Sequence, residues 1–291
     1  MPIRTILVPF EGSETAKPAV ELGLTFGRDV SAHVEVLHVR SDPKDTIPLL
    51  GEGMSVSMIE DMIQIAEKEG GERSVQSRRI FDELVKKFSV KVTDKPGGKE
   101  ATAAWREEQG RGDEVIARLG RLSDLIVVGR PAETSDVLTT LNLNAALFDT
   151  GRPVLVSPPG GYGGDTVLGL HIAISWNGSA QSARAVSSAM PVIAGAKNVT
   201  VLTADSDKTS ATRAPELAQY LEWHGISPAT KTFSATNRQS IGGALLNECG
   251  ESGADLLVMG AYTHSRMRQL ILGGVTRHVL ENAEIPLFMA H

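Results

Sequence analysis

The stretch Asp255-Leu-Leu-Val-Met-Gly260, with Gly273-Gly-Val-Thr276 behind it, decides the fold. Its apolar run is typical of a buried strand, and Gly260 marks the turn into a loop. The residues from Val275 to Leu280 have the pattern of a helix start. A strand, a glycine loop and a helix start suit phosphate binding, because glycine N–H groups approach an anion closely and a helix N-terminus is partly positive. The alternative is a plain turn that binds nothing.

Composition limits the classes of function that the chain can have. The 291 residues suggest two domains, and 41% hydrophobic with 22% charged residues is ordinary for a globular protein with a full core. A net charge of −6, with both signs spread along the chain, argues against a nucleic-acid partner. No apolar run approaches the ~18 to 20 residues of a membrane span. Because the sequence starts with a strand rather than a secretory signal, we expect a cytoplasmic protein without a membrane partner.

The chain contains an internal repeat. The stretch Ile6-Leu-Val-Pro-Phe-Glu-Gly-Ser13 resembles Ile172-Ala-Ile-Ser-Trp-Asn-Gly-Ser179 position by position, at an offset of 166 (172 − 6). Gly129 corresponds to Gly260 at an offset of 131 (260 − 129). The first half therefore carries about 35 extra residues (166 − 131), which we place in the loop and helix of residues 42–70.

Strands alternate with helices in both halves, which predicts an α/β fold with a parallel sheet covered on both faces. In the first half we predict strands at 5–8, 34–39, 90–92, 125–128 and 153–156, and helices at 14–26, 55–69, 71–88, 103–122 and 138–148. In the second half we predict strands at 172–175, 199–202, 229–233, 256–259 and 285–289, and helices at 180–193, 211–224, 241–251 and from 275.

A segment rich in proline and glycine, Pro158-Pro-Gly-Gly-Tyr-Gly-Gly164, separates the two halves. Its spacing partly mimics a nucleotide fingerprint, but no helix follows it, so we interpret it as a linker. The predicted domains are residues 1–158 and 168–291, joined by a linker at 159–167. Ligands of such sheets bind at the carboxyl ends of the strands. In each half those ends hold the loop after the first strand and the loop after the fourth.

Three features resemble the universal stress protein family in its tandem two-domain form. They are an acidic or amide residue before Gly-Ser after strand one, the glycine motif after strand four, and a last strand that opens with proline. The resemblance covers nearly the whole chain. It implies two flavodoxin-like (adenine nucleotide alpha hydrolase-like) domains, each a five-stranded parallel sheet of order 3-2-1-4-5 with helices on both faces. It also implies ATP at the carboxyl edge of strands one and four.

The resemblance places an adenine-nucleotide site, for ATP or AMP, in the second half. The family motif is Gly, two residues, Gly, nine residues, Gly, then Ser or Thr. Gly260 and Gly273 match it, whereas Thr263 and Gly274 depart from it, and a β-branched Thr263 limits the approach of a phosphate to the backbone. The implied nucleotide-binding residues are Asn177, Gly260, His264, Ser265, Arg266, Gly273, Gly274, Val275 and Thr276.

The first half departs further from the family pattern. Glu11 stands in place of an aspartate, and Arg130-Pro131 follows Gly129 where a glycine motif would continue. We predict that this half has lost nucleotide binding and serves as a scaffold or recognition surface. The resemblance also implies that the last strands of the two halves pair, at 154–156 and 287–289, as an intramolecular pseudo-dimer.

The predicted function is that of a stress-response or regulatory protein with an adenine nucleotide and unidentified protein partners. We predict no catalytic residue and no metal site, and at most slow ATP hydrolysis, because the sequence has no Walker lysine motif, no nucleophile elbow and no zinc spacing among its histidines. Cys249, the single cysteine, is expected to be a small buried side chain. Binding of Mg²⁺ and homodimer formation stay open. The alternative function is a protein-interaction module that binds no nucleotide.

Overall fold

The structure, a computed structural model, describes residues 2–42, 55–95, 100–131, 137–162, 167–205, 213–235, 240–261 and 274–291. The first domain contributes β1 (Thr5–Pro9), α1 (Lys17–Val30), β2 (His33–Arg40), α3 (Val56–Lys87), β3 (Lys91–Val92), β4 (Thr102–Gln109), α4 (Gly112–Gly120), β5 (Leu125–Gly129), α5 (Val137–Asp149) and β6 (Val154–Ser157). The second contributes β7 (His171–Ser175), α6 (Ala180–Ile193), β8 (Asn198–Ala204), α7 (Arg213–Trp223), β9 (Ala229–Phe233), α8 (Ile241–Glu251), β10 (Leu256–Gly260), α9 (Gly274–Asn282) and β11 (Leu287–Ala290).

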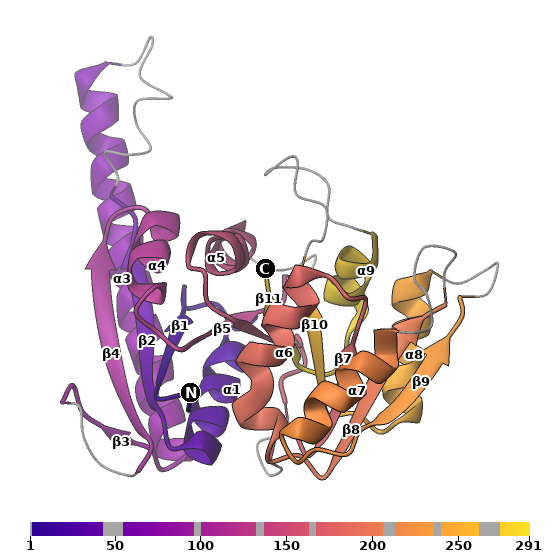
Figure 1. Cartoon of the computed structure of the whole chain (residues 1–291). Coiled ribbons are helices and arrows are strands. Elements are labelled where there is room, and N and C mark those ends of the chain that lie inside the picture. The colour runs from indigo at the N-terminus through magenta and orange to yellow at the C-terminus, as the bar shows by residue number, and fades with distance from the viewer. Residues whose placement is uncertain are drawn as a thin grey trace.

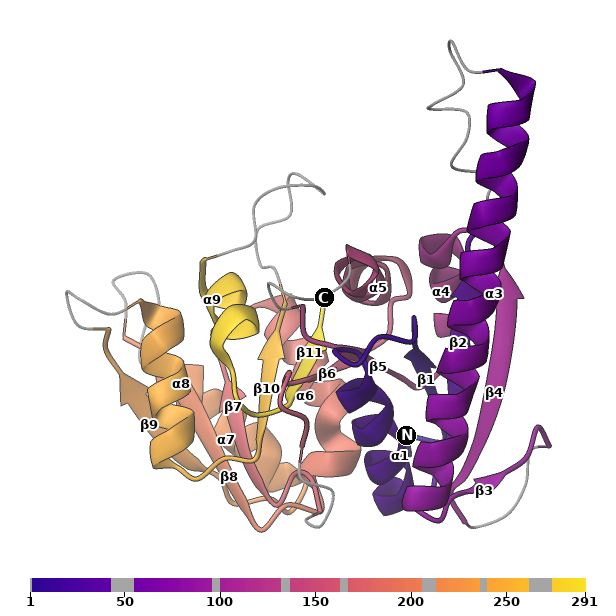
Figure 2. The same ribbon diagram turned by 180° about the vertical axis from the view of Figure 1, so that it is seen from behind.

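The described strands form one eleven-stranded sheet of order β3-β4-β2-β1-β5-β6-β11-β10-β7-β8-β9 (Figures 1 and 2). Within it, β4-β2-β1-β5-β6 and β9-β8-β7-β10-β11 each have the order 3-2-1-4-5, and all their neighbours run parallel. The predicted fold class of two tandem α/β domains is thereby confirmed. The strand β3 adds a two-residue edge that the prediction had taken for the third strand.

The two domains meet where β6 and β11 pair antiparallel. In this register Leu287 lies opposite Val156, and Phe288 lies opposite Leu155. Leu155 and Phe288 are both fully buried, so the hydrophobic core continues across the seam between the domains. These are the strands that were predicted to pair.

Helices cover both faces of the sheet. Apolar side chains of α1, α3, α6 and α7 form one buried cluster, which includes Phe81 and Leu217. Those of α4, α5, α8 and α9 form the cluster on the opposite face, which includes Leu143 and Val279. Each cluster contains residues of both domains, as expected for a doubly wound sheet that runs without a break through the molecule.

Two aspartates repeat the same anchoring contact in the two domains. The carboxylate of Asp124 accepts hydrogen bonds from the backbone N–H groups of Arg4 and Thr5, at 2.9 and 3.0 Å. Asp255 accepts from Gly169, Leu170 and His171, at 3.0, 3.0 and 3.2 Å. Asp255 lies 131 residues after Asp124, which is the offset that relates Gly129 to Gly260. Residues that are equivalent in the sequence repeat therefore make equivalent contacts in the fold.

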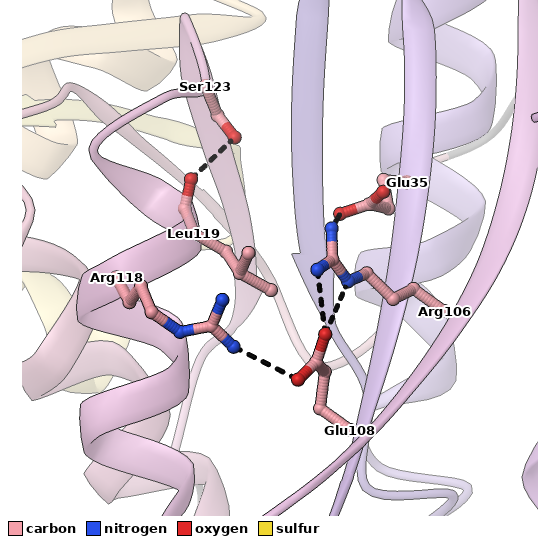
Figure 3. A network of polar contacts seen from close by, with 6 residues as sticks. All are labelled: Glu35, Arg106, Glu108, Arg118, Leu119 and Ser123. Atoms are coloured by element: carbon pink, nitrogen blue, oxygen red, sulfur yellow. Dashed lines mark hydrogen bonds and ion pairs between the residues drawn. The ribbon is translucent and has the colours of Figure 1, made fainter. Parts of the chain in front are cut away.

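The prediction was wrong for the third strand of the first domain. Residues 103–122 were expected to be mostly helical, but residues 102–109 form β4, which pairs with β2 over eight residues, and α4 begins only at Gly112. Alternate residues of a strand share a face, and Arg106 and Glu108 face α4 together. Arg106 contacts Glu35 of β2 and Glu108, which in turn accepts from Arg118 of α4 at 3.0 Å (Figure 3). Pairing with β2 therefore overrides the helical propensity of this Ala- and Glu-rich run.

The longest helix also differs from the prediction of two helices at 55–69 and 71–88. A single helix of 32 residues, α3, begins at the Ser55 cap and passes through Gly70 and Gly71 without a break. Its second half packs on the sheet through Ser77, Phe81 and Leu84. Its first half extends beyond the sheet in both views (Figures 1 and 2), so part of the predicted extra segment of the first half is a projecting helix.

Candidate functional site

The loop after β7 presents the first predicted site residue, Asn177. Its side-chain oxygen accepts from the backbone N–H of Ser179 at 3.0 Å, which forms an Asx turn. Gly178 supplies the positive φ of 70° that this turn needs. Ser179 then caps α6 by accepting from the N–H of Ser182 at 3.1 Å. The Asn177 side chain is exposed at the carboxyl end of β7.

Gly260 ends β10 directly beside this loop. A Cβ atom at Gly260 would lie 2.5 Å from the backbone nitrogen of Ser182 and 2.7 Å from the carbonyl carbon of Gln181. Glycine is therefore required here by the close packing of β10 on the first turn of α6. Since β10 pairs with β7 as far as Met259 and Ser175, Gly260 and the 177–179 loop both follow their strands at the carboxyl edge of the sheet.

The first turn of α9 contains Gly274, Val275 and Thr276. A right-handed crossover from β10 to β11 places this helix start at the carboxyl edge of the sheet, and both views of the chain agree with that position. Thr276 is buried and Val275 packs against the core, whereas a Cβ at Gly274 would meet nothing within 4 Å. The first N–H groups of any α-helix lack a partner within the helix, and a helix start of this kind is suited to an anion.

The remaining predicted site residues, His264, Ser265, Arg266 and Gly273, lie outside the described residues, and so does Thr263. His278 follows the glycine loop in sequence and lies in α9, where its side chain packs against α8. A Cβ at Gly242 of α8 would lie 2.9 Å from the His278 Cβ, so glycine lets the two helices approach. The His278 side chain of α9 therefore packs at the contact between α8 and α9.

In the first domain the equivalent space is occupied by the protein itself. Glu11 is buried, and one carboxylate oxygen accepts hydrogen bonds from the Ser13 hydroxyl at 2.8 Å and the Thr139 hydroxyl at 2.9 Å. Thr139 lies in the first turn of α5, so this helix start is bonded directly to the loop after β1. One oxygen of Glu11 is therefore engaged by two hydroxyl groups of its own domain, whereas Asn177 is exposed at the equivalent position.

Two buried contacts of the first domain were not predicted. The guanidinium of Arg130, just after β5, donates to the carbonyl oxygen of Ala283 in the second domain at 2.6 Å, and burial lowers the pKa of Arg130. His38 is buried, donates from Nδ1 to the carbonyl of Phe10 at 2.8 Å and stacks on Trp105. Burial lowers the pKa of His38 as well. Neither contact leaves a periodic signal in the sequence, because the partners are 153 and 28 residues away.

Two cavities lie away from the predicted nucleotide residues. The larger, of about 800 Å³, is an open groove along α3 that is lined by side chains of both charges, among them Glu67, Lys68 and Arg79. The smaller, of about 250 Å³, lies at the seam between the domains. Within the described ranges, no three His, Cys, Asp or Glu side chains gather as they would around a metal ion. None of the described helices combines the length and hydropathy needed to cross a bilayer.

Comparison with known proteins places this geometry in context. The sequence matches the universal stress protein family over residues 2–136 and 171–291. The comparison with curated proteins found no match. Among solved structures, a universal stress protein from Archaeoglobus fulgidus DSM 4304 is 17% identical with a TM-score of 0.66, over 98% of this chain and 97% of that one. A putative universal stress protein from Pseudomonas aeruginosa UCBPP-PA14 is 14% identical with a TM-score of 0.53, over 99% and 93%. At such identities the similarity to these structures shows the fold alone.

Proposed function

The chain belongs to the universal stress protein family, and from this premise we propose that it is a stress-response or regulatory protein that binds an adenine nucleotide. ATP or AMP would bind at the carboxyl edge of the second domain. Asn177 would contact the adenosine part, while Gly260 and the start of α9 would contact the phosphates. We propose domain limits of 1–158 and 168–291, with the linker between them.

One contrast between the two domains supports this assignment most directly. At the carboxyl edge of the first domain, Glu11 is bonded to Thr139, and α5 is held against the loop after β1. At the carboxyl edge of the second domain, Asn177 is exposed and Gly274 opens onto free space. Judged by the described residues alone, the second domain therefore leaves open the edge that ligands of this sheet type use, and the first domain is proposed to be a scaffold.

We propose little or no catalysis. Cys249, the one thiol of the chain, is buried, and burial raises its pKa to about 12. A thiol with such a pKa supplies almost no thiolate near neutral pH, so Cys249 is unsuited to be a nucleophile. The protein would then act through the difference between its nucleotide-bound and nucleotide-free states, in the cytoplasm and with a protein partner.

The proposed site can be tested by identifying the nucleotide that the purified protein releases on denaturation, and by calorimetric titration with ATP, ADP and AMP. The diagnostic variant is Gly274→Trp. Because a Cβ at Gly274 meets nothing within 4 Å, the indole should leave the core intact and block the approach to the start of α9. We expect bound adenine nucleotide in the unmodified protein and none in the variant.

A matched control is Gly250→Trp. Gly250 lies near the C-terminal end of α8, at the opposite end of the sheet, and a Cβ there also meets nothing within 4 Å. This variant should bind nucleotide like the unmodified protein. If no nucleotide is released and none of the three gives heat on titration, the adenine-nucleotide assignment is wrong. Equal loss of binding in both variants would point to unfolding rather than to a blocked site.

The projecting helix favours a second candidate function, that of a protein-interaction module without nucleotide. Met58, Met62 and Ile65 of α3 are exposed to 52%, 38% and 58%, on the half that extends beyond the sheet. Exposed apolar side chains on one helix suit a protein partner. Replacement of these three by glutamine should then abolish the cellular function while Gly274→Trp leaves it unchanged; the opposite result would favour the nucleotide.

A further inference from the structure

We propose that the seam between the two domains holds a second ligand site, specific for a small phosphate-bearing anion and distinct from the nucleotide site. The cavity of about 250 Å³ is built by both domains. The first domain contributes residues 151–153, the second contributes one face of α6 and the end of β11, and the lining residues are Gly151, Arg152, Pro153, Arg184, Ser187, Ser188, Ala290 and His291.

The charge of this cavity points to an anion. Arg152 and Arg184 are both among the lining residues, and none of the described lining residues is acidic. No ion pair joins either guanidinium to another described residue. This differs from the common pattern in the described part of the chain, where guanidinium groups are paired with carboxylates, as in Arg78, Arg79, Arg106, Arg111, Arg118 and Arg277. Two arginines that line one cavity without a carboxylate favour an anion that carries more than one oxygen.

Arg152 is held in place before any ligand arrives. Its Nε and Nη2 atoms donate to the carbonyl oxygen of Arg121, at 3.0 and 2.7 Å. A carbonyl oxygen fixes the guanidinium but does not neutralise its charge. Little side-chain freedom remains to be lost on binding, which increases the affinity that the contact can supply.

Polar groups of the second domain complete the wall. No hydrogen bond joins the hydroxyls of Ser187 and Ser188, or the guanidinium of Arg184, to another described residue, so all three can donate to a ligand. The His291 ring is fixed, because Nδ1 donates to the carbonyl of Ala261 at 3.1 Å and Phe148 packs edge-on against it at 5.1 Å. Hydroxyl and guanidinium donors together match the oxygens of a phosphate group.

The size of the cavity limits the ligand. Pockets for drug-sized molecules have roughly 300 to 1,000 Å³, so about 250 Å³ suits inorganic phosphate or the monoester of a short carbon chain. A whole nucleotide is too large. The site is therefore chemically separate from the edge of the second domain, and its occupancy does not depend on the nucleotide proposal.

The test is a calorimetric titration of the full chain at constant ionic strength with inorganic phosphate, glycerol 3-phosphate and acetate. The diagnostic variant is Arg184→Gln, whose exposed side chain can be changed without loss of core packing. The matched control is Arg79→Gln, which removes the same charge from exposed α3. We expect saturable binding of at least one phosphate compound at one site per chain, weakened at least about tenfold by Arg184→Gln and unchanged by Arg79→Gln.

The two phosphate compounds separate the sources of the ligand. Tighter binding of glycerol 3-phosphate would identify an organic monoester, and equal binding would identify phosphate itself; both support the site. The proposal is overturned if neither phosphate compound saturates, if acetate binds as tightly, or if Arg184→Gln binds like the unmodified protein. It is also overturned if Gly274→Trp abolishes phosphate binding and Arg184→Gln does not, because the anion would then lie at α9.

Discussion

The glycines of the predicted phosphate motif differ in how closely they are packed. Gly260 belongs to the motif that suggested a phosphate site, yet its backbone also packs on the first turn of α6. Gly274 has no such neighbour. A glycine motif read from the sequence therefore combines a packing requirement at one position with open space at another, and only the second leaves room for a ligand.

Gly260→Ala should destabilise the protein, because the new methyl group would lie 2.5 Å from the Ser182 nitrogen, and this is backbone that cannot turn away. We expect the free energy of unfolding to fall by about 1 to 3 kcal/mol, measured by urea denaturation. Gly250→Ala is the control. Its Cβ meets nothing, and an alanine in α8 should be neutral or stabilising by up to about 1 kcal/mol. Equal stabilities of the two variants would contradict the packing account.

His38 should make stability depend on pH. Burial lowers the pKa of His38 in the folded protein below its ordinary value of 6.5. The unfolded chain therefore takes up a proton first as the pH falls below about 6.5, and the folded state loses stability there, at up to about 1.4 kcal/mol per pH unit. Above that pH the ring is neutral in both states and the contribution is complete. Urea denaturation between pH 7.5 and 5.5 should show a smaller decline for His38→Gln; parallel declines would exclude this role.

At the scale of elements, the sequence predicted most of the fold through its repeat. The offsets of 166 and 131 predicted two equivalent domains, and the alternation of strands and helices predicted their parallel order. The strand β4 was missed because its Ala, Glu and Arg residues favour a helix locally. Its eight pairs with β2 depend on residues about 70 positions away, which local propensity does not record.

The site could be predicted only in part, for a similar reason. The position of Asn177 and Gly260 follows from strand ends, which the sequence marks clearly. The bond between Glu11 and Thr139 spans 128 residues, and the seam cavity joins Arg152 to Arg184 from different domains. Such contacts are set by the packing of whole helices and leave no motif.

The helix α3 offers a test of how an element is stabilised outside the core. Gly70 and Gly71 lie just before Ser74, the first buried residue among the described side chains of α3, and a Cβ at either glycine meets nothing within 4 Å. Replacing both by alanine should stabilise the helix by about 1 kcal/mol per residue without new contacts. Hydrogen exchange of amides 57–69 should slow more than tenfold, while that of the sheet stays constant. Unchanged exchange would mean that something other than helix propensity limits the opening of this segment.

At the scale of the molecule, the two domains should unfold as one unit. Both hydrophobic clusters include residues of both domains, and Leu155 and Phe288 are fully buried at the seam. Trp105 in β4 and Trp176 after β7 report on the two domains separately. In variants with a single tryptophan, urea denaturation followed by fluorescence should give the same midpoint for both reporters.

Phe288→Ala sharpens this prediction. The lost side chain should cost about 3 to 5 kcal/mol and lower both midpoints together, although Phe288 belongs to the second domain alone. Two separate midpoints, with only the Trp176 signal shifted, would show that the domains are independent. Leu122→Ala is the control, since Leu122 is 83% exposed and its loss should move neither midpoint.

The antiparallel pairing of β6 with β11 also has a consequence for the evolution of the sequence. In an assembly of two identical chains, every substitution appears on both sides of the two-fold axis, so a change that suits one side is imposed on the other. Here the two sides of the seam are encoded by separate stretches of one gene. Each side can accumulate its own substitutions. Two domains that began alike are thus free to take different roles, such as the scaffold and the ligand-binding domain proposed above.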